Sequence, residues 1–142
     1  MRVINRRAKF DYQILEIFEA GISLSGSEAK SVREKRVNLS QSFAKIINGE
    51  VYLVNVNIPS ANQALSSTRS RKLLLHKKEI ISLNSKIKQR KLTLVPLAMY
   101  TKGRLVKVEL ALAKPRRKFE KKAQIKKKDI KREIERELKG TQ

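Results

Sequence analysis

The sequence predicts a mainly β protein, a small closed barrel of short antiparallel strands with flanking helices and a basic C-terminal tail. Asn48-Gly49 joins two apolar runs, and Lys102-Gly103 separates two more. Both patterns are typical of hairpins, and short strands joined by hairpins commonly close into a barrel. The 142 residues, of which 40% are hydrophobic, suit one domain with one modest core.

Charge indicates the class of partner. The chain has 34 Lys and Arg against 13 Asp and Glu, a formal net charge of +21. Such an excess favours a polyanion, with nucleic acid first and an anionic membrane second. No apolar run approaches the ~20 residues that cross a bilayer, and the N-terminus lacks the apolar stretch of a secretory signal. Cysteine is absent. We therefore expect a soluble cytoplasmic protein that does not bind membranes.

The first expected strand lies in DYQILEIFEAGISLSG. Leu15 and Ile17 point to one face and Ile14 and Phe18 mostly to the other, so both faces are expected to be partly covered. Gly21 interrupts the pattern and suggests a bulge or bend.

Residues 1–10 are basic without periodicity, and we interpret them as an arm. Further on, Ser25 and Glu28 have the spacing of a capping box, which predicts a short helix. Its inward positions are Ala29 and Val32. Its outward cations are Lys30, Arg33 and Lys35.

The middle of the chain predicts a hairpin, a loop and a helix. SFAKIINGEVYLVNVNI forms the hairpin, and residues 60–71 form a polar loop. KLLLHKKEIISLNSKIKQRK then changes period. Ile80, Leu83 and Ile87 follow helical spacing, so a helix with one buried stripe is expected.

The second hairpin pairs TLVPLAMY with LVKVELALA. Pro96 in its first strand indicates an edge position or a bulge. Alternation along the last strand separates a core face from an outer face that holds Lys107 and Glu109. The core face holds Val106, Val108, Leu110 and Leu112.

The tail, residues 114–142, has 13 basic and 5 acidic residues, a local net charge of +8. Ile130, Ile134 and Leu138 form a narrow apolar stripe. A lone helix of this length is marginal in water, so we expect a tail that becomes helical when a polyanion neutralises it. The alternative is a solvated helix lying on the barrel.

Catalytic patterns are missing from the sequence. His76 is the only histidine, and no nucleophile is marked beside it. The acidic residues are scattered, and no glycine-rich phosphate loop is followed by Lys-Ser/Thr. We expect a binding protein that is not an enzyme and has no metal or cofactor.

Basic residues occur in every segment, which favours nucleic-acid contact over a merely solvated face. No DNA-binding motif appears, and 5% aromatic residues give no dense stacking platform for single strands. Structured RNA, recognised by shape and backbone, is therefore favoured.

Several motifs at matching spacing resemble the SsrA-binding protein (small protein B) family. They include FEAGI, G-x-E-x-K-S, RxRKLLL and LALAK, and with the basic tail the resemblance covers nearly the whole chain. It implies an oligonucleotide-binding (OB-type) barrel. It also implies binding to the tRNA-like domain of transfer-messenger RNA and delivery of that RNA to stalled ribosomes (trans-translation).

The resemblance implies four RNA-binding residues. They are Asn5, Glu19, Leu74 and Lys107. Glu19 in a surface ion pair is the alternative for that residue, and Leu74 by itself would indicate core. With the surrounding cations, the predicted RNA-binding set also includes Arg6, Arg7, Lys30 and Arg33.

The resemblance further implies that the tail enters the small-subunit decoding region and the mRNA channel of the ribosome. The residues expected there are Phe119, Lys121, Lys122, Lys126, Lys127, Lys128, Lys131 and Arg132. Lys122 stands where many members have Arg, and it lacks the planar fork of a guanidinium.

We expect an RNA-binding domain over 1–113, a tail over 114–142, and a monomer. The main rival is a structural ribosomal-RNA-binding protein.

Overall fold

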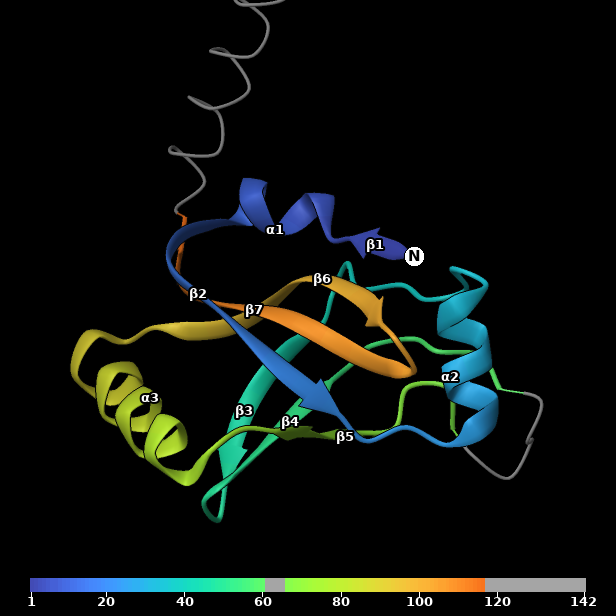
Figure 1. Cartoon of the computed structure of the whole chain (residues 1–142). Coiled ribbons are helices and arrows are strands. Elements are labelled where there is room, and N and C mark those ends of the chain that lie inside the picture. The colour runs from blue at the N-terminus through green and yellow to red at the C-terminus, as the bar shows by residue number, and fades with distance from the viewer. Residues whose placement is uncertain (61–65, 117–142) are drawn as a thin grey trace, which may run out of the picture.

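The computed structural model describes residues 1–60 and 66–116 and arranges them around a closed sheet (Figure 1). In this part of the chain, seven strands are hydrogen-bonded in the order β1-β6-β3-β4-β5-β2-β7, and β6 also pairs with β7. The sheet therefore closes into a barrel, with β1 added along β6. Every strand pair is antiparallel, which confirms the predicted fold class.

The chain forms three helices and seven strands in its described part. They are β1 (Arg2–Ile4), α1 (Arg6–Asp11), β2 (Tyr12–Ile22), α2 (Gly26–Arg33), β3 (Phe43–Ile47), β4 (Glu50–Val54), β5 (Arg71–Leu74), α3 (Lys77–Arg90), β6 (Thr93–Lys102) and β7 (Leu105–Pro115). In Figure 1, α2 and α3 lie at opposite sides of the barrel, and α1 lies across one end.

Local sequence signals set several of these boundaries. The capping box is confirmed, because the Ser25 side chain accepts from the Glu28 N–H and the Glu28 side chain accepts from the Ser25 N–H. The Asn48-Gly49 hairpin is confirmed as well. Both residues have positive φ, 51° and 76°, as a type I′ turn requires.

Two apolar clusters stabilise the barrel. The main core fills its interior, and the predicted inner face of β7 is confirmed, since Val106, Val108, Leu110 and Leu112 are all at most 9% exposed. On α3, Ile80 and Leu83 are buried in the same core, as the helical stripe predicts. A second cluster lies where α1 covers β6 and β7. It consists of Ala8, Val95, Leu97, Ala111 and Ala113.

The prediction of an irregular N-terminal arm is wrong. Arg2–Ile4 pairs with β6, and Arg6–Asp11 is helical with Ala8 only 3% exposed. The physical reason is non-local, because a three-residue strand and a six-residue helix have too few residues to show a period. Their stability comes from the β6–β7 surface against which they pack.

The sequence pattern does not predict a strand between the polar loop and the expected helix. Arg71–Leu74 is the strand β5, paired with β4 and β2, and α3 begins only at Lys77. Arg71 and Leu73 are buried, whereas Lys72 and Leu74 are exposed. This alternation is hard to recognise in the sequence because one of the two buried positions of β5 holds an arginine, Arg71.

Three smaller expectations change on β2 and the last hairpin. Leu15 and Ile17 are 41% and 58% exposed, so the outer face of β2 is open there. The β2 bulge lies between Ile14 and Glu16 rather than at Gly21. The final turn is Gly103-Arg104, one residue later than predicted, because Lys102 pairs with Leu105. Of the two alternatives predicted at Pro96, an edge position or a bulge, the register shift between Pro96 and Ala98 shows the bulge.

Candidate nucleic-acid interface

The register of the barrel places one row of residues across the outside of five strands. Arg2 on β1 pairs with Tyr100 on β6, which pairs with Lys107 on β7. Lys107 pairs with Gly21 on β2, and Gly21 pairs with Leu74 on β5. Paired residues point to the same face of a sheet. We call these five residues the outer row.

Gly21 gives the outer row its shape. A Cβ atom at this position would lie 3.2 Å from Leu74 Cβ and 3.5 Å from Leu74 Cδ1. The glycine therefore leaves room for Leu74 to lie over β2, where its side chain stays 54% exposed. The sequence by itself indicates core for Leu74, and the structure places it on the surface instead.

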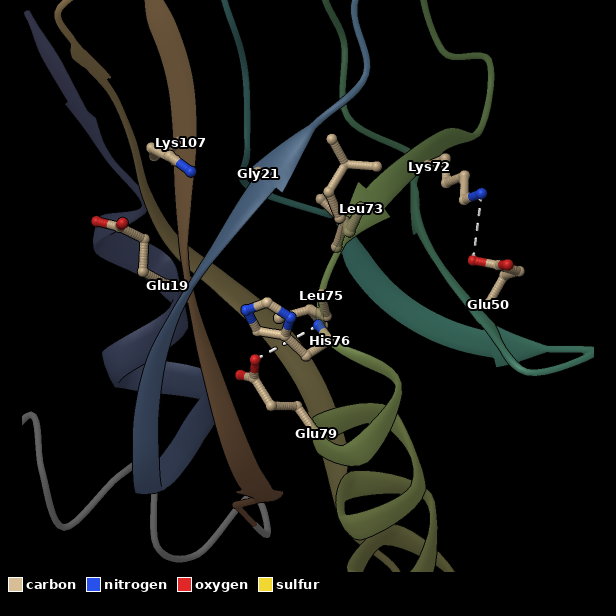
Figure 2. A pocket seen from close by; sticks show the side chains of 10 residues that line it. Glu19, Gly21, Glu50, Lys72, Leu73, Leu75, His76, Glu79 and Lys107 are labelled. Atoms are coloured by element: carbon tan, nitrogen blue, oxygen red, sulfur yellow. Dashed lines mark hydrogen bonds and ion pairs between the residues drawn. The ribbon is translucent and has the colours of Figure 1, made fainter.

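A hollow of about 560 Å³ opens on this side of the barrel (Figure 2). Its ten lining residues come from β2, β4, β5, α3 and β7 and from the two residues that join β5 to α3. They are Glu19, Gly21, Glu50, Lys72, Leu73, Leu74, Leu75, His76, Glu79 and Lys107. Figure 2 shows Lys107 and Glu19 on one side of β2, and Lys72 with its ion-pair partner Glu50, 3.3 Å away, on the other.

Three of the residues predicted to bind RNA, Glu19, Leu74 and Lys107, thus line one hollow although they are far apart in the sequence. Lys107 is on the outer face, as the alternation of β7 predicts. A second groove of about 310 Å³ shares Gly21, Leu74 and Lys107 with the hollow and extends to the exposed Leu105. The candidate interface therefore combines cations with exposed aliphatic groups.

The carboxylate of Glu19 is held ionised. A hydrogen bond from the Tyr100 hydroxyl lowers the pKa of Glu19, and the nearby charges of Lys102 and Lys107 lower it further. Lys102 Nζ lies 3.8 Å from Glu19 Oε1, so the surface ion pair left open by the sequence is present. Glu19 is still 40% exposed and can accept hydrogen bonds from a partner.

Tyr100 belongs to the same surface and was not marked by sequence reasoning. Burial, followed by the hydrogen bond to Glu19, raises the pKa of Tyr100 to about 12, so the phenol remains a donor. The Arg2 guanidinium lies 5.1 Å from the centroid of the Tyr100 ring and 2.7 Å from Glu109 Oε2. β6 is a continuous apolar run from Leu94 to Met99 without alternation, so the sequence gives no signal for an outward Tyr100, and the pairing of β1 with β6 brings Arg2 to it.

Helix α2 adds two of the predicted cations at the edge of this surface. Lys30 and Arg33 are both exposed. The Arg33 guanidinium donates to the carbonyl oxygen of Arg104 at 3.2 Å, which joins α2 to the β6–β7 turn beside the second groove. Arg33 remains exposed in spite of this contact.

The structure separates Asn5 from the hollow. Asn5 is 5% exposed, and its amide nitrogen donates to the carbonyl oxygens of Leu39 and Pro96 at 3.1 and 2.9 Å. Its amide oxygen has no hydrogen-bond partner within the described residues. Asn5 therefore ties β1 to the Pro96 bulge. The neighbouring Arg6 and Arg7 on α1 are exposed, and Arg7 lies 3.3 Å from Asp11.

The eight predicted ribosome-binding residues, from Phe119 to Arg132, lie outside the described residues, as does the stripe of Ile130, Ile134 and Leu138. Across 1–60 and 66–116, no group of three His, Cys, Asp or Glu side chains is placed to hold a metal ion.

Of the helices in the described part of the chain, none combines the length and the apolar character needed to span a membrane.

Comparison with known proteins gives one consistent result. The model of the family described as SmpB protein matches residues 2–140. An SsrA-binding protein of Sulfurihydrogenibium sp. is 52% identical over 140 residues, covering 96% of this chain and 92% of the relative. One of Thermosipho melanesiensis is 49% identical over 147 residues, covering 99% and 100%.

A solved structure extends the similarity to the fold. It is described as "tmRNA-SmpB: a journey to the center of the bacterial ribosome", and it superimposes with a TM-score of 0.68 at 44% sequence identity. The superposition covers 82% of this chain and 85% of the other. Sequence and fold therefore agree over most of the chain.

Proposed function

The chain belongs to the SmpB protein family, and on that premise we propose that it binds transfer-messenger RNA and brings it to stalled ribosomes for trans-translation. The observation that carries this proposal is the meeting of Glu19, Leu74 and Lys107 at one hollow on the outside of the barrel. The names of the relatives and of the solved structure support both partners, the RNA and the ribosome.

The chemistry of the interface suits the tRNA-like domain of this RNA. Lys107 and the α2 cations Lys30 and Arg33 neutralise backbone phosphates and fix the orientation of the RNA. Ionised Glu19 accepts only, so it pairs with a base amine or a ribose 2′-hydroxyl. The exposed side chain of Leu74 offers apolar contact to a sugar or a base face.

The division of labour along the chain is part of the proposal. The folded barrel binds the RNA, and the basic tail occupies the empty decoding region and mRNA channel. The eight tail residues given above carry the charge and the single aromatic group for that contact. We place the protein in the cytoplasm as a monomer that works by binding rather than by catalysis.

Competition binding tests the proposal. The full chain is titrated into labelled tRNA-like domain at near-physiological salt with excess bulk tRNA. We expect tight binding to survive the competitor, because shape and base contacts add to phosphate attraction. We also expect affinity to fall steeply with salt as counterions are released.

Displacement of the labelled tRNA-like domain by excess bulk tRNA would contradict the proposal. It would mean that charge alone holds the RNA, and the structural ribosomal-RNA-binding protein would become the better assignment. The two functions are separated further by adding ribosomal RNA fragments as a second competitor.

A further inference from the structure

A buried charge cluster lies between α2 and β5, away from the hollow. Glu28 on α2 has a fully buried side chain, and both of its oxygens are occupied. The Arg69 guanidinium donates to both Glu28 oxygens, and Arg71 Nε donates to Glu28 Oε2 at 2.8 Å. The backbone N–H of Ser25 donates to Glu28 Oε1 at 3.0 Å.

Arg71 extends the cluster to the segment after β4 and to the loop before β5. Its side chain is also fully buried. Its two terminal nitrogens donate to the carbonyl oxygens of Val56, Arg69 and Ser67, each at 2.9 Å. One guanidinium thus joins the segment after β4, the loop before β5, and β5 itself to the N-terminal turn of α2.

Such a cluster is poorly explained by stability alone. Two charges removed from water lose hydration that their attraction only partly offsets, and apolar side chains of the same volume often serve as well. What a saturated, directional cluster does supply is a defined geometry. Here that geometry is the placement of α2 against β5.

Both elements present groups of the candidate interface close to the cluster. Lys30 and Arg33 follow Glu28 on α2, within two turns. Leu74 ends the strand that Arg71 begins. β5 is held to β2 by only two register pairs and by the Ser23 N–H, which donates to the Lys72 carbonyl at 3.0 Å. On its other side β5 pairs with β4 through Arg71, Lys72 and Leu73, so Leu74 is paired with β2 alone and its position depends on how the strand is held at Arg71.

We propose that Glu28, Arg69 and Arg71 are positioning residues for RNA binding, which hold the α2 cations and Leu74 in one fixed arrangement without contacting the RNA. This inference rests on the proposed function for its ligand. The structural part of the inference, that the cluster holds β5 in place against β2, does not depend on any ligand.

Arg69 is the residue to change, because its side chain is 32% exposed and Glu28 keeps Arg71 when it is lost. Arg69→Lys preserves the positive charge but has no planar fork for two carboxylate oxygens. Arg69→Met removes the charge as well. Arg90→Lys at the exposed end of α3 is the matched control, since α3 lies at the opposite side of the barrel (Figure 1).

Binding of the labelled tRNA-like domain is measured for the full chain and for each variant. We expect both Arg69 variants to bind about tenfold more weakly, which corresponds to about 1.4 kcal/mol. Arg90→Lys should bind like the unchanged protein. In a cycle with Leu74→Ala, the effect of Arg69→Met should shrink, because the group that it positions is already missing.

Hydrogen exchange supplies a readout that needs no RNA. The Ser23 amide reports the β2–β5 contact, and we expect it to exchange faster in both Arg69 variants and unchanged in Arg90→Lys. Failure of the unchanged protein to select the tRNA-like domain would overturn the proposed function, whereas the exchange result would still decide the structural part of the inference.

Two outcomes would overturn the inference. If Arg69→Lys binds normally while Arg69→Met loses affinity additively with Leu74→Ala, Arg69 is itself a charge contact to RNA. If both variants bind normally with unchanged exchange at Ser23, the cluster positions nothing that the RNA uses.

Discussion

Gly21 and Leu74 are register partners on β2 and β5, and a methyl group on Gly21 would come within 3.2 Å of Leu74 Cβ. So short a contact forces the neighbour to give way. Leu74 Cβ is attached directly to the backbone of β5 and has little freedom to move. The missing side chain of Gly21 therefore determines where an exposed leucine lies on the candidate interface.

Gly21→Ala is expected to displace Leu74 and weaken RNA binding while the barrel stays folded. The added methyl group should push β5 away from β2 by a few tenths of an ångström. Affinity for the tRNA-like domain and the thermal midpoint are the measurements. Gly26→Ala is the control, because no atom lies within 4 Å of a Cβ there. Equal affinities for both variants would contradict the steric argument.

Leu74→Ala tests whether this leucine serves binding rather than packing. With 54% of the residue exposed, truncation should change the free energy of unfolding by no more than about 0.5 kcal/mol. RNA affinity should nevertheless fall, since an apolar contact is lost. Ile81→Ala, at a position on α3 that is 63% exposed, should leave both quantities unchanged. A large loss of stability in Leu74→Ala would show that this residue contributes mainly to packing.

Lys107→Glu should weaken RNA binding strongly without unfolding the protein. The side chain faces away from the core, and the new carboxylate would repel phosphates next to Glu19 and Glu109. Removing the Lys107 charge should also let the pKa of Glu19 rise, because Lys107 contributes to lowering it. Binding assays and NMR titration of Glu19 measure the two effects. Unfolding would show that Lys107 is needed for the barrel itself.

Acid should destabilise the protein through Glu28. Burial alone raises the pKa of Glu28, but hydrogen bonds from Arg69, Ser25 and Arg71 outweigh it and hold the folded-state pKa at about 2, below the ordinary 4.5. A carboxyl group whose pKa is lower in the folded state than in the unfolded state stabilises the folded protein at pH values above the unfolded-state pKa. That contribution, of the order of 3 kcal/mol, is lost as pH falls from about 4.5 to about 2.

Denaturant unfolding between pH 6 and pH 2 measures this contribution. Glu28→Gln cannot titrate, so it should be less stable at pH 6 and lose less stability on acidification than the unchanged protein. Parallel pH curves for the two proteins would show that the acid sensitivity comes from other carboxylates.

Truncation should separate the two proposed partners. β7 continues to Pro115, and the Arg116 N–H donates to the Asp11 carbonyl at 2.9 Å. A cut after Ala113 would therefore damage the barrel, and the chain should end at Arg116. We expect this shortened chain to bind the tRNA-like domain normally and to fail in a ribosome rescue assay. An equal loss in both assays would make the tail an RNA-binding element first.

Local signals in the sequence predict the elements that depend on near neighbours. The Ser25 and Glu28 cap, the Asn48-Gly49 turn and the Ile80 and Leu83 stripe are all present in the structure. Each depends on residues a few positions apart, whose geometry is the same in any fold. The two short elements before Tyr12 and the strand β5 were not predicted from the sequence, because contacts with distant strands stabilise them.

The candidate site divides in the same way. Alternation alone places Lys107 on the outer face, and family resemblance marks Glu19, Leu74 and Asn5. Pattern reasoning missed Arg2 and Tyr100, whose contact depends on the pairing of β1 with β6. Nothing in the sequence pattern distinguishes Arg71 from the surface cations, whereas the structure buries its charge fully against Glu28.

Periodicity and turn chemistry predict the antiparallel barrel, and net charge predicts a polyanionic partner, because these are properties of neighbouring residues and of the whole composition. The family is indicated separately, by the resemblance of motifs at matching spacing. The exposure of Leu74 over Gly21, the burial of Asn5 and the carboxylate shared by Arg69 and Arg71 are instead consequences of tertiary contacts. Those relationships join residues that are distant along the chain, and they exist only once strand register has brought their backbones together.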